Sequence, residues 1–177
     1  MANVYDQGAR YTLRLDIPGL LPWLLQPPLA ATLLFRDWLD TRSVPYPGEP
    51  DRVCDTVAAL DSLVDPHWLG ALLMDPQTRP DPRIRLRTVE YVIRLVSSLE
   101  CGTRPGEWYQ IVAVVLNLTG EEQDETLEMR LPGAPEVGLE WTVKILCLAQ
   151  MSAAETLAGI ERGDWGRAVL PFVPLLH

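Results

Sequence analysis

Hydrophobic residues recur in short runs along the whole chain, and prolines or polar residues separate most of these runs. In Val4–Leu15 the apolar positions have a weak helical spacing, and Pro18-Gly19 is expected to break this helix. Leu20–Leu25 continues as a short apolar segment, while Leu29–Leu39 fits either a short helix or the lead into a strand. We therefore predict an N-terminal helical segment over about residues 1–34.

Two short apolar segments in the middle of the chain predict a β-hairpin. Val53–Leu60 is rich in small and β-branched residues, Trp68–Met74 is almost continuously apolar, and turn-forming residues fill Asp61–Pro66 between them. Pro76 favours an end of the second strand at Met74, because proline has no N–H to donate inside a sheet.

The second half of the chain alternates between further helices and strands. Ile84–Leu99 has the apolar spacing of a helix, and Thr126–Leu131 alternates like a half-exposed strand. Trp108–Leu118 is apolar enough to be buried on both faces at the centre of a sheet. We expect Leu139–Leu148 to form one more long strand.

The C-terminal region predicts a capped helix followed by an apolar tail. Ser152 and Glu155 have the spacing of a capping box for a helix over Ala153–Arg162. Ala168–Leu176 is apolar but interrupted by prolines, so we expect it to pack back on the core. This order of elements predicts an α/β (α+β) fold, with a β-sheet covered by helices, in a single domain over residues 1–177.

The composition fits a folded protein, because 47% of the residues are hydrophobic. Four prolines interrupt the longest apolar region, Ile17–Leu34, which makes a membrane-spanning helix unexpected there. The first residues lack the basic start and apolar run of a secretory signal. We therefore expect a cytoplasmic protein that does not bind membranes.

The cysteines and histidines do not form a pattern typical of zinc or disulfide sites. Cys54, Cys101 and Cys147 are far apart in the sequence, and the chain has only two histidines, His67 and His177. Reduced, partly buried thiols are the interpretation that fits these positions.

The net charge of −9 opposes non-specific attraction to nucleic acid, yet arginines gather in one stretch of the sequence. Arg83, Arg87 and Arg94 share one face of the predicted helix with Glu90. A solvated face with ion pairs inside the helix is the simpler interpretation, and a ridge that contacts phosphates is the alternative. The whole cluster consists of Arg79, Arg83, Arg85, Arg87 and Arg94.

Three polar residues on the predicted hairpin are candidates for a metal site. Asp55 lies in the first strand, and Asp75 and Gln77 follow the second. Two carboxylates and a carboxamide on neighbouring strands could surround one divalent cation, because magnesium prefers oxygen ligands. The simpler interpretation is a solvent-facing aspartate and an Asp-Pro pair that opens a turn.

The motifs around these residues resemble a known family. Arg52–Val57 is followed by Asp75-x-Gln77-Thr-x-Pro-Asp81-Pro and by an arginine-bearing helix that contains Glu90-Tyr91. The chain thereby resembles the recombination-promoting nuclease/transposase family of the PD-(D/E)XK nuclease superfamily, from about Asp37 to its end. Further matching segments are Val114–Gly120, Glu128–Gly133 and Leu170–Leu175.

The resemblance implies a restriction-endonuclease-like core, in which a mixed sheet is flanked by helices and the active site lies at one edge of the hairpin. It implies magnesium- or manganese-dependent hydrolysis of DNA phosphodiester bonds. Asp55 and Asp75 would bind the metal, and Gln77 would orient the attacking water. Arg79, Arg83 and Arg87 would be candidates for contacts with DNA.

The sequence departs from the family pattern at two neighbouring positions. Asp75 replaces a longer glutamate, and Pro76 lies between the two site residues. Magnesium tolerates little change in ligand distance, so the shorter side chain favours an alternative function. This alternative is a catalytically inactive nuclease fold that acts as a binding or regulatory protein, with a homodimer as one possible assembly. A structural domain unrelated to nucleases is the third hypothesis.

Overall fold

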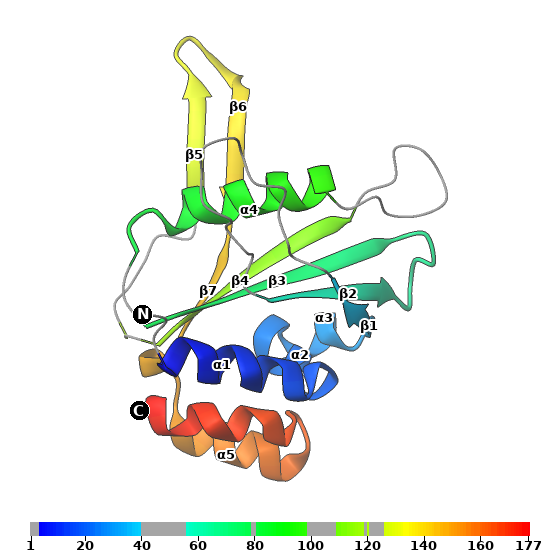
Figure 1. The fold of residues 1–177 in the computed structure, drawn as a ribbon, viewed down its shortest axis with the longest axis vertical. Helices are drawn as coiled ribbons and strands as arrows, with labels where there is room; N and C mark the ends of the chain where they lie inside the picture. Colours follow the sequence, from blue (N-terminus) through cyan, green and yellow to red (C-terminus); the bar gives the residue numbers. More distant parts are fainter. Residues whose placement is uncertain (1–3, 40–55, 79–80, 99–108, 119, 121–125) are drawn as a thin grey trace.

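A five-stranded mixed β-sheet forms the centre of the structure (Figure 1). The computed structural model describes residues 4–39, 56–78, 81–98, 109–118, 120 and 126–177. The first three strands are antiparallel neighbours, and the last two run parallel to the third. In spatial order the strands are β1 (Leu33–Trp38), β2 (Thr56–Ser62), β3 (Leu69–Gln77), β4 (Gln110–Asn117) and β7 (Lys144–Cys147).

Helices cover both faces of this sheet (Figure 1). The helix α4 (Ile84–Ser98) lies over one face, and the remaining helices lie under the other. Successive side chains of β3 alternate between the two cores, because Leu72 and Met74 pack with the lower helices while Leu73 packs with α4 residues such as Leu95. The lower helices are α1 (Val4–Leu15), α2 (Ile17–Leu25), α3 (Pro27–Ala30), α5 (Ala153–Arg162) and the 3₁₀ helix η2 (Arg167–Leu175). The predicted mixture of strands and helices is confirmed.

The N-terminal helices differ from the prediction at Pro18-Gly19. This pair lies inside α2 and does not separate two helices. The break falls at Asp16, whose side chain accepts a hydrogen bond from the Gly19 N–H at 3.0 Å. Pro18 is tolerated because the first N–H groups of a helix have no partner within it. For residues 29–39 the sequence fits either a helix or a strand, and most of this segment forms the strand β1.

The predicted end of the hairpin at Met74 is wrong, because β3 continues to Gln77. Pro76 and Gln77 pair with Leu116 and Asn117 of the parallel neighbour β4. The Gln77 carbonyl accepts from the Leu118 N–H at 2.9 Å, so the backbone of Gln77 faces β4. Successive residues direct their backbone groups to opposite neighbours, so Pro76 faces away from β4 and removes no bond from that ladder.

The prediction of one long strand over Leu139–Leu148 is also wrong, because this segment contributes to two strands in two different sheets. β6 (Ala134–Thr142) pairs with β5 (Thr126–Leu131) in a separate hairpin, and the chain then enters the central sheet as β7. The hairpin projects past α4 (Figure 1), and the Trp141 indole N–H donates to the Thr88 hydroxyl at 3.0 Å. This bond joins the base of the hairpin to α4.

The C-terminal predictions are confirmed. After the short 3₁₀ helix η1 (Leu148–Gln150), the Ser152 hydroxyl accepts from the Glu155 N–H at 3.3 Å and caps α5. The tail packs on the core as η2, where Phe172 stacks on Trp23 at 5.4 Å between ring centroids. Cys147 is a free, partly buried thiol, while Cys54 and Cys101 lie outside the described residues. None of the helices within the described ranges is long and apolar enough to cross a membrane.

A close contact between Gly19 and Gly166 fixes the C-terminal segment against α2, and it predicts the effect of a methyl group. The Gly166 N–H donates to the Gly19 carbonyl at 2.7 Å, and a Cβ on Gly166 would lie 2.6 Å from the Gly19 Cα. We expect Gly166→Ala to lower the free energy of unfolding by about 1–3 kcal/mol, measured by urea denaturation. In Gly8→Ala the new Cβ meets open space on α1, so this control should be neutral or stabilising. Equal stabilities of the two variants would contradict the contact.

Candidate functional site

Asp75 and Gln77 lie together at the carboxyl end of β3, as their spacing predicts. They share the α4 face of the sheet with Leu73, because side chains two residues apart in a strand point the same way. Asp75 is 1% exposed and Gln77 is 5% exposed. The Gln77 amide donates to Asp75 Oδ2 at 3.3 Å, so the two side chains form one buried polar pair.

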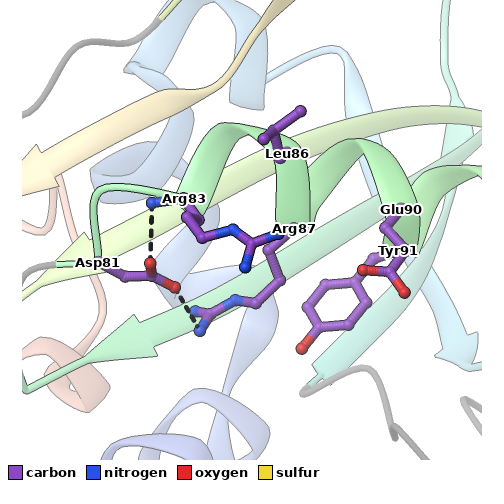
Figure 2. Close-up of a pocket in the computed structure, with 6 residues that line it drawn as sticks. All are labelled: Asp81, Arg83, Leu86, Arg87, Glu90 and Tyr91. Carbon is purple, nitrogen blue, oxygen red and sulfur yellow. Dashed lines mark hydrogen bonds and ion pairs between the residues drawn. The ribbon is translucent and has the colours of Figure 1, made fainter. Parts of the chain in front are cut away.

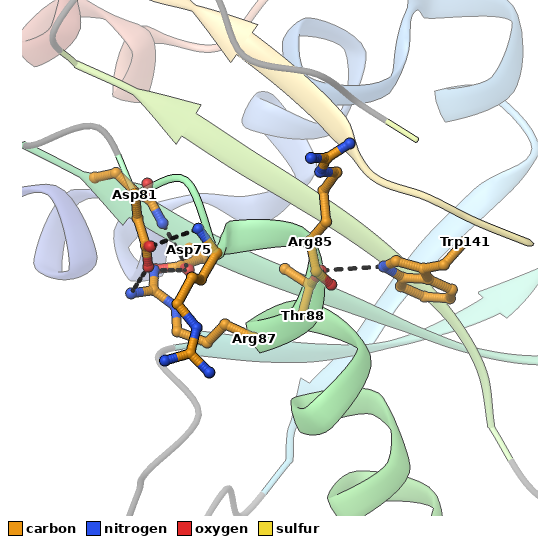
Figure 3. Close-up of polar contacts among 8 residues, drawn as sticks. Asp75, Asp81, Arg85, Arg87, Thr88 and Trp141 are labelled. Carbon is orange, nitrogen blue, oxygen red and sulfur yellow. Dashed lines mark hydrogen bonds and ion pairs between the residues drawn. The ribbon is translucent and has the colours of Figure 1, made fainter. Parts of the chain in front are cut away.

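Arg87 of α4 reaches over this pair and binds two acids at once (Figure 3). Its Nη2 donates to Asp75 Oδ2 at 2.6 Å, and its Nη1 lies 2.9 Å from Asp81 Oδ2. Asp81 is itself fixed by the start of α4, since its other oxygen accepts from the Arg83 N–H at 2.8 Å. Arg87 therefore joins the end of β3 to the turn before the helix.

The Arg87 guanidinium stays charged through the neutral pH range. Burial lowers the pKa of its guanidinium, but the negative charge and the hydrogen bond of Asp75, together with Tyr91 and Asp81, raise that pKa by more. The net result is a pKa above the ordinary arginine value, which is already far above neutrality. A rise in pH through the neutral range therefore leaves the ion pair intact.

Two buried atoms at this site have no hydrogen-bond partner among the described residues, namely Gln77 Oε1 and Arg87 Nε. A buried acceptor without a donor is unfavourable, so Gln77 Oε1 is suited to a ligand such as water or a cation. Together with the Asp75 carboxylate it supplies two oxygen donors, which is the donor chemistry that magnesium and manganese prefer. Asp75 thus has the chemistry of a ligand for such a cation, and Gln77 Oε1 that of an acceptor for a water molecule.

The third predicted site residue, Asp55, lies outside the described residues, so its position relative to Asp75 is not shown. Its sequence neighbour Thr56 pairs with Met74, the neighbour of Asp75, in the confirmed antiparallel hairpin. Among the residues that the structure describes, no three histidines, cysteines or acids are grouped as they would be around a metal ion.

A pocket of about 410 Å³ lies at the first turns of α4 and shares Arg87 with the buried pair (Figure 2). Arg87 and Asp81 belong both to this pocket and to the contacts around Asp75. Arg83 is exposed, and its guanidinium makes no ion pair with any residue in the described ranges. The residues that line the pocket are Asp81, Arg83, Leu86, Arg87, Glu90 and Tyr91.

Arg83, Arg87 and Glu90 of the predicted helix face lie together around the pocket, while the side chain of Arg94 lies outside the described part of the structure. Arg83 and Arg87 both line the pocket, whereas Arg79 lies outside the described residues. Arg85 lies on another side of α4 (Figure 3), and its Nη1 donates to the Thr126 carbonyl at 2.7 Å. The acids that bind Arg87 come from β3 and from the turn before α4, so its ion pairs are not the ones predicted within the helix.

The sequence interpretation missed Asn117, a polar residue at the same edge of the sheet. Asn117 is fully buried at the end of β4 and pairs with Gln77 in the parallel register. Its position directly after a buried strand was the available signal, because the carboxyl ends of parallel strands meet at one edge.

Comparisons with models of protein families, with curated proteins and with solved structures find no match to this chain. The family resemblance therefore stays a prediction from the motifs, and function has to be argued from the site.

The ion pair between Arg87 and Asp75 predicts a non-additive effect on stability. Arg87→Gln alone leaves a buried carboxylate without its cation, so we expect it to lower the free energy of unfolding by about 2 kcal/mol. Adding Asp75→Asn should recover part of this loss, because an amide pair needs no charge compensation. Urea denaturation of both single variants and the double variant measures the coupling. Additive effects would show that the pair does not stabilise the fold.

Proposed function

We propose that this protein is a metal-dependent DNA endonuclease with a restriction-endonuclease-like core. The observation that carries the proposal is the buried pair of Asp75 and Gln77, which lies beside an arginine-lined pocket at the end of the hairpin. Supporting it, the antiparallel β2 and β3 continue into the parallel β4, and helices cover both faces, as the family resemblance implies.

In the proposed reaction Asp75 and Asp55 hold the cation, and Gln77 orients the attacking water through its buried Oε1. The bound cation would polarise the scissile phosphate and lower the pKa of the water. Gln77 is neutral and cannot stabilise negative charge as a cation would, so Arg83 and Arg87 are the side chains that balance the charge of the phosphate.

The proposal predicts DNA cleavage that requires Mg²⁺ or Mn²⁺ and both acids. Asp55→Ala and Asp75→Ala should reduce cleavage of plasmid DNA to the level without protein, and excess chelator should do the same. Asp65→Ala is the matched control, because Asp65 is an exposed acid that accepts a hydrogen bond from the His67 N–H in the β2–β3 turn. Cleavage that survives in Asp55→Ala or in excess chelator would refute the proposal.

A second candidate function follows from the bond between Arg87 and Asp75. A guanidinium already neutralises the carboxylate, and Asp75 has a shorter side chain than the glutamate of the family pattern. Both features favour a nuclease fold that has lost catalysis and serves in binding or regulation, either alone or as a homodimer.

Restoring the longer acid distinguishes the two candidates. If the site has lost activity through its shorter side chain, Asp75→Glu should gain metal-dependent DNA cleavage over an inactive parent protein. Isothermal titration with Mn²⁺ provides the second measurement, since an inactive fold should show no binding that depends on Asp75. If the parent protein cleaves DNA and binds Mn²⁺ through Asp75, the second candidate is wrong.

A further inference from the structure

Arg87 lies at the boundary between the buried pair and the open pocket. Its side chain is 30% exposed, whereas the carboxylate that it binds at 2.6 Å is 1% exposed. The same guanidinium also lines the pocket and binds Asp81, whose side chain is 28% exposed (Figure 2). Arg87 therefore contacts the buried acid and the pocket at the same time.

Arg87 and a divalent cation would compete for the Asp75 carboxylate. Asp75 Oδ2 already accepts from both Arg87 and Gln77. Two positive charges a few ångströms apart repel each other strongly where water is excluded, so each weakens the binding of the other to the carboxylate. A cation at Asp75 therefore favours release of Arg87.

A bound divalent cation also changes the charge beside the pocket. Three acids and two arginines lie at the pair and the pocket among the described residues. The cation adds two positive charges next to them, so an anion is attracted more strongly. These residues are Asp75, Asp81, Glu90, Arg83 and Arg87.

We propose that Arg87 couples metal binding at Asp75 to phosphate binding in the pocket. It holds Asp75 while no divalent cation is bound, and on metal binding it turns to bind a DNA phosphate beside Arg83. The planar fork of arginine suits both positions, because it matches carboxylate and phosphate oxygens equally well. This inference rests on the proposed function, since it takes Asp75 to be a metal ligand.

The coupling must be reciprocal, so DNA raises the affinity for the metal by the same factor by which the metal raises the affinity for DNA. Any metal near a phosphate gives some coupling, and only the part that depends on Arg87 tests the proposal. Isothermal titration measures the Mn²⁺ affinity, and fluorescence anisotropy measures the affinity for a short DNA duplex with and without Mn²⁺. A gel confirms that the duplex stays intact.

Three arginine substitutions on α4 give different expected results. Arg87→Gln removes the competitor at Asp75, so it should bind Mn²⁺ about fivefold more tightly while the effect of Mn²⁺ on DNA affinity falls about fivefold or more. Arg83→Gln should leave Mn²⁺ affinity unchanged and weaken DNA binding both with and without Mn²⁺, because Arg83 lines the pocket without touching Asp75. Arg85→Gln, on another side of the helix, should change neither quantity.

The outcomes separate this inference from the function on which it rests. If wild-type protein binds no Mn²⁺, or if Asp75→Asn binds it equally well, the proposed metal site fails. If Mn²⁺ binds through Asp75 but Arg87→Gln weakens it or keeps the full coupling, the inference is overturned and the metal site stands. If Arg87→Gln does not fold, Arg87→Lys gives the second test, because lysine keeps the charge and loses the planar fork. Unchanged Mn²⁺ affinity together with unchanged coupling in that variant also overturns the inference. Coupling seen with a nucleoside monophosphate and absent with DNA would overturn DNA as the ligand.

Discussion

The ion pair between Asp75 and Arg87 is the interaction on which the organisation of the candidate site depends. A carboxylate that is 1% exposed needs a cation or several donors, and Arg87 and the Gln77 amide provide both at Oδ2. The same arginine holds Asp81, whose other oxygen accepts from the Arg83 N–H just before α4. One guanidinium thus fixes the end of β3, the turn and the first turns of the helix around the pocket.

Arg87 belongs both to the candidate site and to the contacts that hold α4 on the sheet. The α4 helix packs on the sheet through Ile84 and Leu95, and Trp141 ties it to the projecting hairpin through Thr88. Arg87 adds a polar attachment at the end of the sheet where Gln77 and Asn117 lie side by side. A ligand that draws Arg87 away from Asp75 acts on a contact between strand and helix, and local changes there can alter binding in the pocket.

Much of the fold could be predicted from local patterns, because amphipathic spacing reports which faces are buried. The spacing in Ile84–Leu99 and the uninterrupted run in Trp108–Leu118 predict α4 and β4. The errors arose where a tertiary neighbour decided the outcome. Pro76 is compatible with a strand because it faces away from β4, and Leu139–Leu148 changes sheets at Val143, which a continuous apolar pattern does not reveal.

In the candidate site too, local spacing predicts some contacts, and tertiary packing decides the others. Residues two apart in a strand must share a face, so the meeting of Asp75 and Gln77 could be predicted, but the choice of Arg87 over Arg83 or Arg85 as their partner depends on how α4 packs. The central claim is that a divalent cation binds at Asp75, next to the Gln77 amide. Its most direct test is the NMR spectrum of the side-chain amides during addition of substoichiometric Mn²⁺. The account predicts selective broadening of the Gln77 amide signals, with the signals of Gln110 at the opposite end of β4 unchanged. Equal broadening of both amides, or of neither, would contradict it.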